Sequence, residues 1–321
     1  MQETNVISEV YKKEILEGLT SAPKYIPSKY FYDVEGSRIF QDIMRMPEYY
    51  LTDCEYEILQ KHKSDILKNI RKQDNRFDLV ELGAGDGLKT GVLIEYFLHQ
   101  DADFIYVPVD ISEDALMKLV NKMRMNFQGL TITELAGDYF RVLSDLNYCD
   151  HCQKIALFLG SNIGNYNFED AKKFLFQLSS VLNKADKVLI GFDLVKDPEV
   201  ILKAYNDPHG NSRKFNLNLL QRINRELGAD FDTDNFLHYP LYDPAMNAAK
   251  SYLISKKKQN IFISELDTHI AFDKWEHIYT EMSQKFTPSV IASLAEQTGY
   301  KIVENYYDDQ VYFVDSLWEK I

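Results

Sequence analysis

The hydrophobic and polar positions of this chain follow two alternating patterns between residues 77 and 195. Short apolar runs rich in Val, Ile and Phe are followed by longer segments in which apolar residues recur every three to four positions. The short runs are typical of buried strands, and the longer segments are typical of amphipathic helices. Strands that alternate with helices of about 10–15 residues indicate βαβ units.

The two patterns together predict an α/β fold with a mainly parallel, doubly wound sheet. Strands are expected at 77–83, 104–112, 130–139 and 186–195, with one more strand and a loop within 154–166; helices are expected from the first glycine loop to about residue 99, at 113–127 and at 168–182. Right-handed crossovers bring the carboxyl ends of such strands to one edge of the sheet. Ligands of doubly wound sheets bind at that edge.

Small residues follow the first predicted strand at this edge. The sequence LVELGAGDGLKTG places Gly83, Gly85 and Gly87 between the strand and the helix. Glycine permits a tight turn, and it lets a ligand approach the backbone because it has no Cβ. The loop is neither G-x-G-x-x-G nor a P-loop. By itself it is therefore also compatible with a turn that binds nothing.

The next strand ends favour a nucleoside ligand. Asp110 ends the second strand, where a carboxylate can accept both ribose hydroxyls. Gly137, Asp138 and Tyr139 end the third strand, where an acid and an aromatic ring suit an adenine base. A further small-residue loop, LGSNIGNY, follows the fourth strand. Nicotinamide cofactors and S-adenosylmethionine (SAM) both fit this arrangement. The glycine pattern favours SAM, which has no pyrophosphate, and Glu81 in E-x-G-x-G is common in class I methyltransferases.

Composition narrows the possible partners. The chain has 321 residues, a formal net charge of −13 and a pI of about 5.1, which argues against a general nucleic-acid binder. No apolar run reaches the length of about 18 residues expected of a membrane span, and no signal peptide is recognisable. We expect a cytoplasmic protein without membrane or nucleic-acid partners.

The cysteines and histidines do not indicate a metal site. Cys149 and Cys152 form a C-x-x-C pair around His151, but a zinc site usually needs a second pair and the sequence has none. A surface turn explains the pair more simply, although redox or metal use stays open. No H-x-x-x-H spacing occurs among the seven histidines, so we predict no bound metal.

Two regions outside the predicted sheet carry clustered aromatic and polar residues. Residues 29–59 contain many tyrosines, and residues 193–232 together with 279–286 contain Asn, Asp, Glu and Ser among apolar positions. Such clusters are commonly core or solvated surface. The motifs within them nevertheless resemble one family: KYFYDVEGS, MPEYYLT, ELGAGDGLKT, PVDIS, LGSNIGN, DLVKDP, AYNDPHG, FNLNLLQRINRELGADFD and TEMSQKF occur in this order along nearly the whole chain.

These motifs are similar to those of the histidine-specific Nα-methyltransferases of ergothioneine biosynthesis. The resemblance implies a Rossmann-like class I SAM-binding domain, expected at residues 60–195 and 287–321. It also implies a substrate-binding domain built from the N-terminal segment and an insertion after strand five, at residues 1–59 and 196–286. The substrate would be an amino acid, and we expect a monomer.

The resemblance also implies roles for single residues. The cofactor would contact Gly83, Gly85, Lys89, Asp110, Gly137, Asp138, Tyr139, Gly160 and Ser161. Tyr32 and Asn165 are assigned as catalytic residues near the reacting amine, and Asn165 and Tyr205 would bind the substrate carboxylate. Glu281 and Ser283 would bind the imidazole, and Tyr49 and Ser251 would complete the substrate site.

Ser251 departs from the family pattern. The histidine-specific members carry a methionine against the imidazole, and the segment AAKSYLIS aligns Ser251 with it. A more polar site leaves room for another amino acid or small amine as substrate. A member that binds SAM or an amino acid without turnover, as a sensor or partner subunit, is the alternative outside the enzymes.

Overall fold

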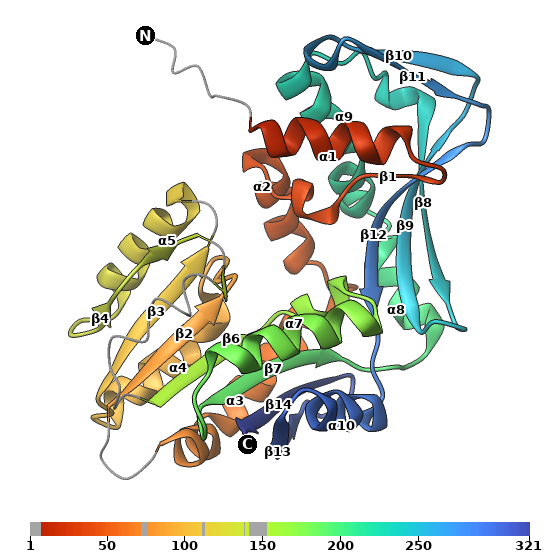
Figure 1. The fold of residues 1–321 in the computed structure, drawn as a ribbon. Coiled ribbons are helices and arrows are strands. Elements are labelled where there is room, and N and C mark those ends of the chain that lie inside the picture. The colour runs from red at the N-terminus through yellow and green to blue at the C-terminus, as the bar shows by residue number, and fades with distance from the viewer. Residues whose placement is uncertain (1–7, 72–75, 111–112, 138, 141–152) are drawn as a thin grey trace, which may run out of the picture. The chain divides into compact units, whose positions relative to one another are not determined.

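The computed structural model describes residues 8–71, 76–110, 113–137, 139–140 and 153–321 (Figure 1). The chain forms two compact units, each built from two separate segments. The N-terminal unit comprises Met1–Tyr50 and Lys196–Ser283, and the sheet unit comprises Leu51–Val195 and Gln284–Ile321. Each unit is described by itself.

The sheet unit is an α/β structure around one mixed sheet. Its strands run in the order β13-β14-β7-β6-β2-β3-β4, and β5 also pairs with β3. Their bounds are β2 Phe77–Leu82, β3 Phe104–Asp110, β4 Thr131–Ile132, β5 Leu135–Ala136, β6 Gln153–Phe158, β7 Lys187–Asp193, β13 Tyr300–Tyr307 and β14 Phe313–Lys320. The strands from β7 to β4 are parallel, whereas β14 is antiparallel to both β7 and β13. The predicted α/β fold is confirmed.

One predicted strand is wrong in its length. Residues 130–139 form two short strands, β4 and β5, instead of one. Residues 133 and 134 between them belong to neither strand, although the backbone N–H of Thr133 still donates to the Tyr106 carbonyl of β3 at 3.0 Å. Among the described strands this one has only β3 beside it, so there is no second neighbour to hold its polar Thr and Glu residues in an extended ladder.

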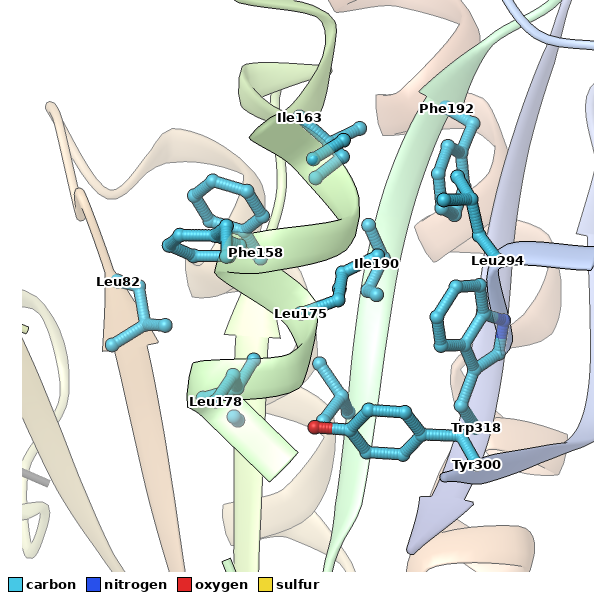
Figure 2. Packing of buried hydrophobic residues seen from close by; sticks show 14 of the residues in the cluster. Leu82, Phe158, Ile163, Leu175, Leu178, Ile190, Phe192, Leu294, Tyr300 and Trp318 are labelled. Atoms are coloured by element: carbon cyan, nitrogen blue, oxygen red, sulfur yellow. The ribbon is translucent and has the colours of Figure 1, made fainter. Parts of the chain in front are cut away.

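Helices cover both faces of this sheet. On one face α7 (Phe168–Val181) and α10 (Pro288–Gln297) bury a cluster that includes Leu82, Phe158, Ile190 and Trp318 (Figure 2). On the other face lies α4 (Leu88–His99), whose Phe97 ring meets those of Phe77 and Phe104 edge-on. Because alternate strand residues point to opposite faces, each buried strand supplies both clusters. Helices α3 (Tyr50–Ile70) and α5 (Glu113–Asn126) also occur among the described residues.

The N-terminal unit contains a smaller sheet with the strand order β1-β12-β9-β8. The strands are β1 Lys24–Tyr25, β8 Phe236–Asp243, β9 Ala248–Ser255 and β12 His277–Gln284, and β10 Gln259–Ile263 pairs with β11 Thr268–Phe272 in a separate hairpin. Its helices are α1 Glu9–Thr20, α2 Val34–Met44, α8 Pro198–Tyr205 and α9 Asn211–Leu227. Its described 3-10 turns are η1 Ser28–Phe31, η3 Thr233–Asn235 and η4 Ser264–Leu266, and a further 3-10 turn, η2 Asn162–Asn165, lies in the sheet unit.

Helix α9 organises the core of the N-terminal unit. Its Phe215 ring stacks on Phe31 with centroids 4.4 Å apart. Its Asn218 amide donates to Asp33 at 2.8 Å, and Arg225 forms an ion pair with the same carboxylate. Asp33 also caps α2 by accepting the backbone N–H of Gly36 at 2.6 Å. These contacts fix the segment that carries Tyr32.

No helix within the part of the chain that the structure describes is long and apolar enough to cross a membrane.

Candidate active site

The glycine loop after β2 has a backbone that only glycine adopts easily. Gly83, Gly85 and Gly87 have φ angles of +73°, +55° and +67°. A β-carbon at Gly87 would lie 2.1 Å from the Met123 side chain, so the loop packs closely against α5. A β-carbon at Gly85 would have no described atom within 4 Å. The loop is therefore closely packed at Gly87, whereas no described residue would meet a side chain at Gly85.

Three strand ends meet where the strand order reverses. The strand β2 lies between β3 and β6, and the loops after β2 and β6 leave this switch point together. A β-carbon at Gly83 would lie 3.0 Å from the Tyr139 hydroxyl and 3.6 Å from the Asn162 amide nitrogen. One at Gly160 would lie 3.0 Å from the Lys89 Nζ. The structure thus brings together four of the predicted cofactor residues, Gly83, Lys89, Tyr139 and Gly160.

A residue that the sequence analysis missed holds this group together. The fully buried carboxylate of Glu55, on α3, forms an ion pair with Lys89. It also accepts the backbone N–H of Gly160, at 2.7 and 2.9 Å from its two oxygens. Glu55 therefore links α4 to the loop after β6.

Ser161 lies three residues after β6, and Asp110 is the last residue of β3. Ser161 has a φ of +56°, is 4% exposed, and its Oγ accepts the backbone N–H of Asp193 at 3.2 Å. Asp193 in turn pairs with the buried Lys285 at 2.7 Å. The carbonyl of Asp110 accepts the N–H of Gly137 at 3.0 Å, so the backbone holds Asp110 in place. Asp138, Cys149 and Cys152 lie outside the described residues.

In the N-terminal unit, the predicted substrate residues lie on neighbouring strands. Ser251 on β9 is 2% exposed, and its Oγ donates to Glu281 Oε2 on β12 at 3.1 Å. The hydroxyl of Thr280 donates to the Ser251 carbonyl at 2.9 Å. Ser283 lies two residues beyond Glu281, so both side chains point to the same face of β12. Ser283 is buried and Glu281 half-buried.

Tyr32 lies close to this group. Its ring is 48% exposed and rests edge-on against Phe40 and Phe215. Removal of the Tyr32 hydroxyl from water raises its pKa above the ordinary value. The nearby Glu281 carboxylate and the Tyr205 hydroxyl raise it further. The hydroxyl is therefore protonated at neutral pH.

Tyr205 and Tyr49 meet in a second small cluster with Ala249 of β9. Tyr205 ends α8, and its carbonyl accepts a hydrogen bond from His238 Nε2 at 3.1 Å. His238 Nδ1 lies 2.8 Å from the amide nitrogen of Asn216. Burial lowers the pKa of His238, so the neutral ring accepts at Nδ1 and donates at Nε2. No local sequence pattern indicates this support for Tyr205.

One predicted substrate residue belongs to the other unit. Asn165 ends the 3-10 turn η2 of the sheet unit and is exposed. Among the described residues, no group of three or more His, Cys, Asp or Glu side chains has the arrangement of a metal site.

The similarity of this chain to known proteins decides its family. A model of the SAM-dependent, histidine-specific methyltransferases matches residues 11–320. The chain belongs to this family. It is therefore a SAM-dependent methyltransferase, and the switch-point loops are where a methyltransferase with this strand order is expected to bind its cofactor.

Three relatives show the range within and around the histidine-specific methyltransferases. The histidine N-alpha-methyltransferase of Mycobacterium tuberculosis is 33% identical over 298 residues, which are 93% of this chain and 91% of that protein. Ergothioneine biosynthesis protein 1 of Schizosaccharomyces pombe is 29% identical over 287 residues, or 88% of this chain but only 37% of that protein. The 4-dimethylallyltryptophan N-methyltransferase of Claviceps purpurea is 28% identical over 211 residues, 63% of this chain and 60% of that protein.

The residues at the switch point fit SAM. No described residue would block a ligand that approaches the backbone at Gly85, and the Tyr139 ring and the Asp110 carboxylate would suit adenine and ribose. The positive charge of Lys89 would suit the carboxylate of the cofactor's methionine portion. SAM has no diphosphate, so the loop does not need the further glycine that dinucleotide-binding loops use.

Proposed function

We propose that this methyltransferase transfers methyl groups from SAM to the α-amino nitrogen of L-histidine, continuing to the trimethylated betaine. The observation that carries the proposal is the joint placement of Ser251, Glu281, Tyr32 and Tyr205 within one unit. The family description and the Mycobacterium relative support the choice of histidine.

Imidazole recognition is assigned to Glu281 and Ser283. The Glu281 carboxylate accepts a ring N–H, and the Ser283 hydroxyl donates to the other ring nitrogen or accepts from it. A site built to bond two ring nitrogens discriminates strongly against apolar side chains, because its own polar groups would then be left unpaired.

The rest of the substrate is assigned to the aromatic residues and Asn165. Tyr205 and Asn165 bind the carboxylate, Tyr49 lines the site, and Tyr32 orients the amine. Since its pKa is raised, Tyr32 is a neutral hydroxyl, and its oxygen accepts an N–H of the amine so that the nitrogen lone pair stays free for the methyl group. The assignment of Asn165 rests on the family resemblance.

The bound cofactor supplies an electrophilic methyl group on a sulfonium sulfur. The chain's own task is then to hold a neutral amine in line and to exclude water. A nearby sulfonium disfavours the charged ammonium form, so the amine loses its proton to solvent more readily. Transfer ends after three steps because a quaternary nitrogen has no lone pair.

A different amine is the second candidate substrate. The family resemblance aligns Ser251 with a methionine of the histidine-specific members, and a relative acts on a tryptophan derivative according to its name. The hydroxyl of Ser251 brings a donor to Glu281 that a methionine cannot supply. This observation favours a more polar ring site than that of the family.

The deciding experiment is SAM turnover with each of the twenty amino acids and with 4-dimethylallyltryptophan, followed by mass spectrometry of the products. Three methyl groups on histidine alone support the proposal. Turnover of another amine moves the proposal to the second candidate. Products with one or two methyl groups at saturation overturn the trimethylation.

The roles of the units and the state of the protein are proposals as well. We assign SAM binding to the sheet unit and substrate binding to the N-terminal unit. We also propose a monomer in the cytoplasm. Light scattering after size exclusion measures the mass, for which a monomer gives 37.4 kDa, and cell fractionation locates the protein.

A further inference from the structure

Two carboxyl groups face each other behind the cofactor loops of the sheet unit. Glu55 of α3 and Asp315 of β14 are both fully buried. Asp315 pairs in register with Gly191 of β7. A β-carbon at Gly191 would lie 2.2 Å from Glu55 Oε1, so the missing side chain makes room for the Glu55 carboxylate beside Asp315.

The hydrogen bonds of the two groups differ. Glu55 has donors in Lys89 and in the backbone N–H of Gly160. Both oxygens of Asp315 are buried and, among the described residues, no group donates to them. Two carboxylates in contact repel, and neither can donate to the other. A single proton on Asp315 removes the repulsion and supplies the missing donor, because the acid then donates to Glu55.

We propose that Asp315 is a protonated acid that donates to Glu55, and that Glu55 thereby positions Lys89 and the Gly160 backbone for the cofactor. Burial and the negative charge of Glu55 both raise the pKa of Asp315 well above its ordinary value, in agreement with this geometry. With Asp315 neutral, the charges of Glu55 and Lys89 balance. The inference rests on the proposed binding of SAM at Lys89.

This arrangement gives Glu55 a function beyond folding. Lys89 and Gly160 lie on different elements, and a β-carbon at Gly160 would come within 3.0 Å of Lys89 Nζ. A carboxylate that bonds both fixes the spacing between the ammonium group and the loop backbone. Glu55 is therefore a positioning residue that acts on the cofactor through Lys89.

The test is a double-mutant cycle on SAM binding, measured by calorimetry without amino acid. Glu55→Gln should raise the Kd for SAM roughly tenfold or more, as for a lost charge-assisted hydrogen bond. In a Lys89→Met background the same change should have little further effect. Equal effects of Glu55→Gln in both backgrounds would overturn the positioning role. Glu57→Gln, on the surface of the same helix, is the matched control and should leave binding unchanged.

Asp315 is tested by substitution and by infrared spectroscopy. Asp315→Asn keeps a donor toward Glu55 and should preserve SAM affinity, whereas Asp315→Leu removes the donor and should weaken it. At pH 8 the protein should show a protonated-carboxyl band that Asp315→Asn abolishes. A band unchanged by this substitution means that Asp315 is ionised, which overturns the proposal.

Gly191→Ala provides a probe that changes no charge. Its methyl group meets Glu55 Oε1, so it should displace the carboxylate and weaken SAM binding as Glu55→Gln does. If the unaltered enzyme binds no SAM, the cofactor assignment itself fails. If the unaltered enzyme binds SAM and the Glu55 variants bind it equally well, only this inference fails.

Discussion

Ser251 donates a hydrogen bond to Glu281 between the strands β9 and β12, with Oγ 3.1 Å from Oε2. The bond fixes one carboxylate oxygen of the residue that we assign to the imidazole. A thioether at position 251 could not make it. The serine therefore changes how the neighbouring acid is held and does more than change the size of the side chain.

The first prediction concerns these two residues. Glu281→Ala should raise the KM for histidine far more than the KM for SAM, because it removes the acceptor for a ring N–H. Ser251→Ala should also raise the KM for histidine, but less, by a factor that corresponds to about 1 kcal/mol for one hydrogen bond. Steady-state kinetics with each substrate varied in turn measures both effects.

Ser255→Ala is the control for this pair. Ser255 lies on the same strand, and its hydroxyl donates to the Lys257 carbonyl. It should lower stability without changing the KM for histidine. Equal changes in both KM values for Glu281→Ala would give that residue a structural role only.

The second prediction concerns Tyr205. Tyr205→Phe removes only the hydroxyl and leaves the carbonyl bond with His238 in place. The Kd for histidine should rise by a factor that corresponds to about 1.5–3 kcal/mol, the range for hydrogen bonds to charged groups, while SAM binding stays the same. Tyr242→Phe, in the same cluster, is the control. Unchanged histidine binding would exclude Tyr205 from the carboxylate site.

Asp110 carries the third prediction. Asp110→Ala should weaken SAM binding by about 1–3 kcal/mol, because charge-assisted bonds to the ribose are lost. The backbone bond between Asp110 and Gly137 does not depend on the side chain, so the loop should keep its shape. Calorimetry compares this variant with Asp103→Ala, which lies just before the opposite end of the same strand. Equal SAM affinity in the two variants would refute the ribose role.

The fourth prediction is a pH dependence of stability. Burial raises the pKa of Glu81 to about 7, although the hydroxyls of Thr90 and Tyr106 both donate to it. The folded protein therefore holds a proton that the unfolded chain releases near pH 4.5. The contribution is fully present below pH 4.5 and is lost as the pH rises to 7, a loss of about 3 kcal/mol.

Urea denaturation between pH 4.5 and 8 measures this loss. Glu81→Gln stays neutral, so it should remove the contribution of Glu81 to the pH dependence of the free energy of unfolding. The two proteins should differ most in this pH dependence between pH 4.5 and 7. Parallel stability curves for the two proteins would show that Glu81 is ionised throughout.

Sequence patterns predicted the parallel part of the sheet because its strands are buried and apolar. The strands β13 and β14 escaped prediction. In β14 the buried polar residues Asp315 and Ser316 interrupt the apolar run, so the pattern does not identify a buried strand. The split of this segment into β4 and β5 depends on where it pairs with β3, and a local sequence pattern does not indicate such pairing.

Sequence patterns predicted candidate site residues where these end or follow a strand, as Asp110, Gly83 and Gly160 do. Glu55 was not, because it lies in a helix with many charged residues, where an acid is usually solvated. Its carboxylate also needs the space left by the missing side chain of Gly191, which is far away in sequence. His238 likewise acts through a carbonyl group, and a sequence does not show which carbonyl a ring will face.

The pairing of β1 with β12 has a consequence for the synthesis of the chain. Lys24 forms an ion pair with Glu276, 252 residues later. At about 5–20 residues per second, a ribosome needs roughly 13–50 seconds to make the intervening chain. During that time the apolar side of α1, with Ile15 and Leu19, has no β12 to complete its unit. Ile15 and Leu19 therefore lack part of their native unit until its last strand has been translated.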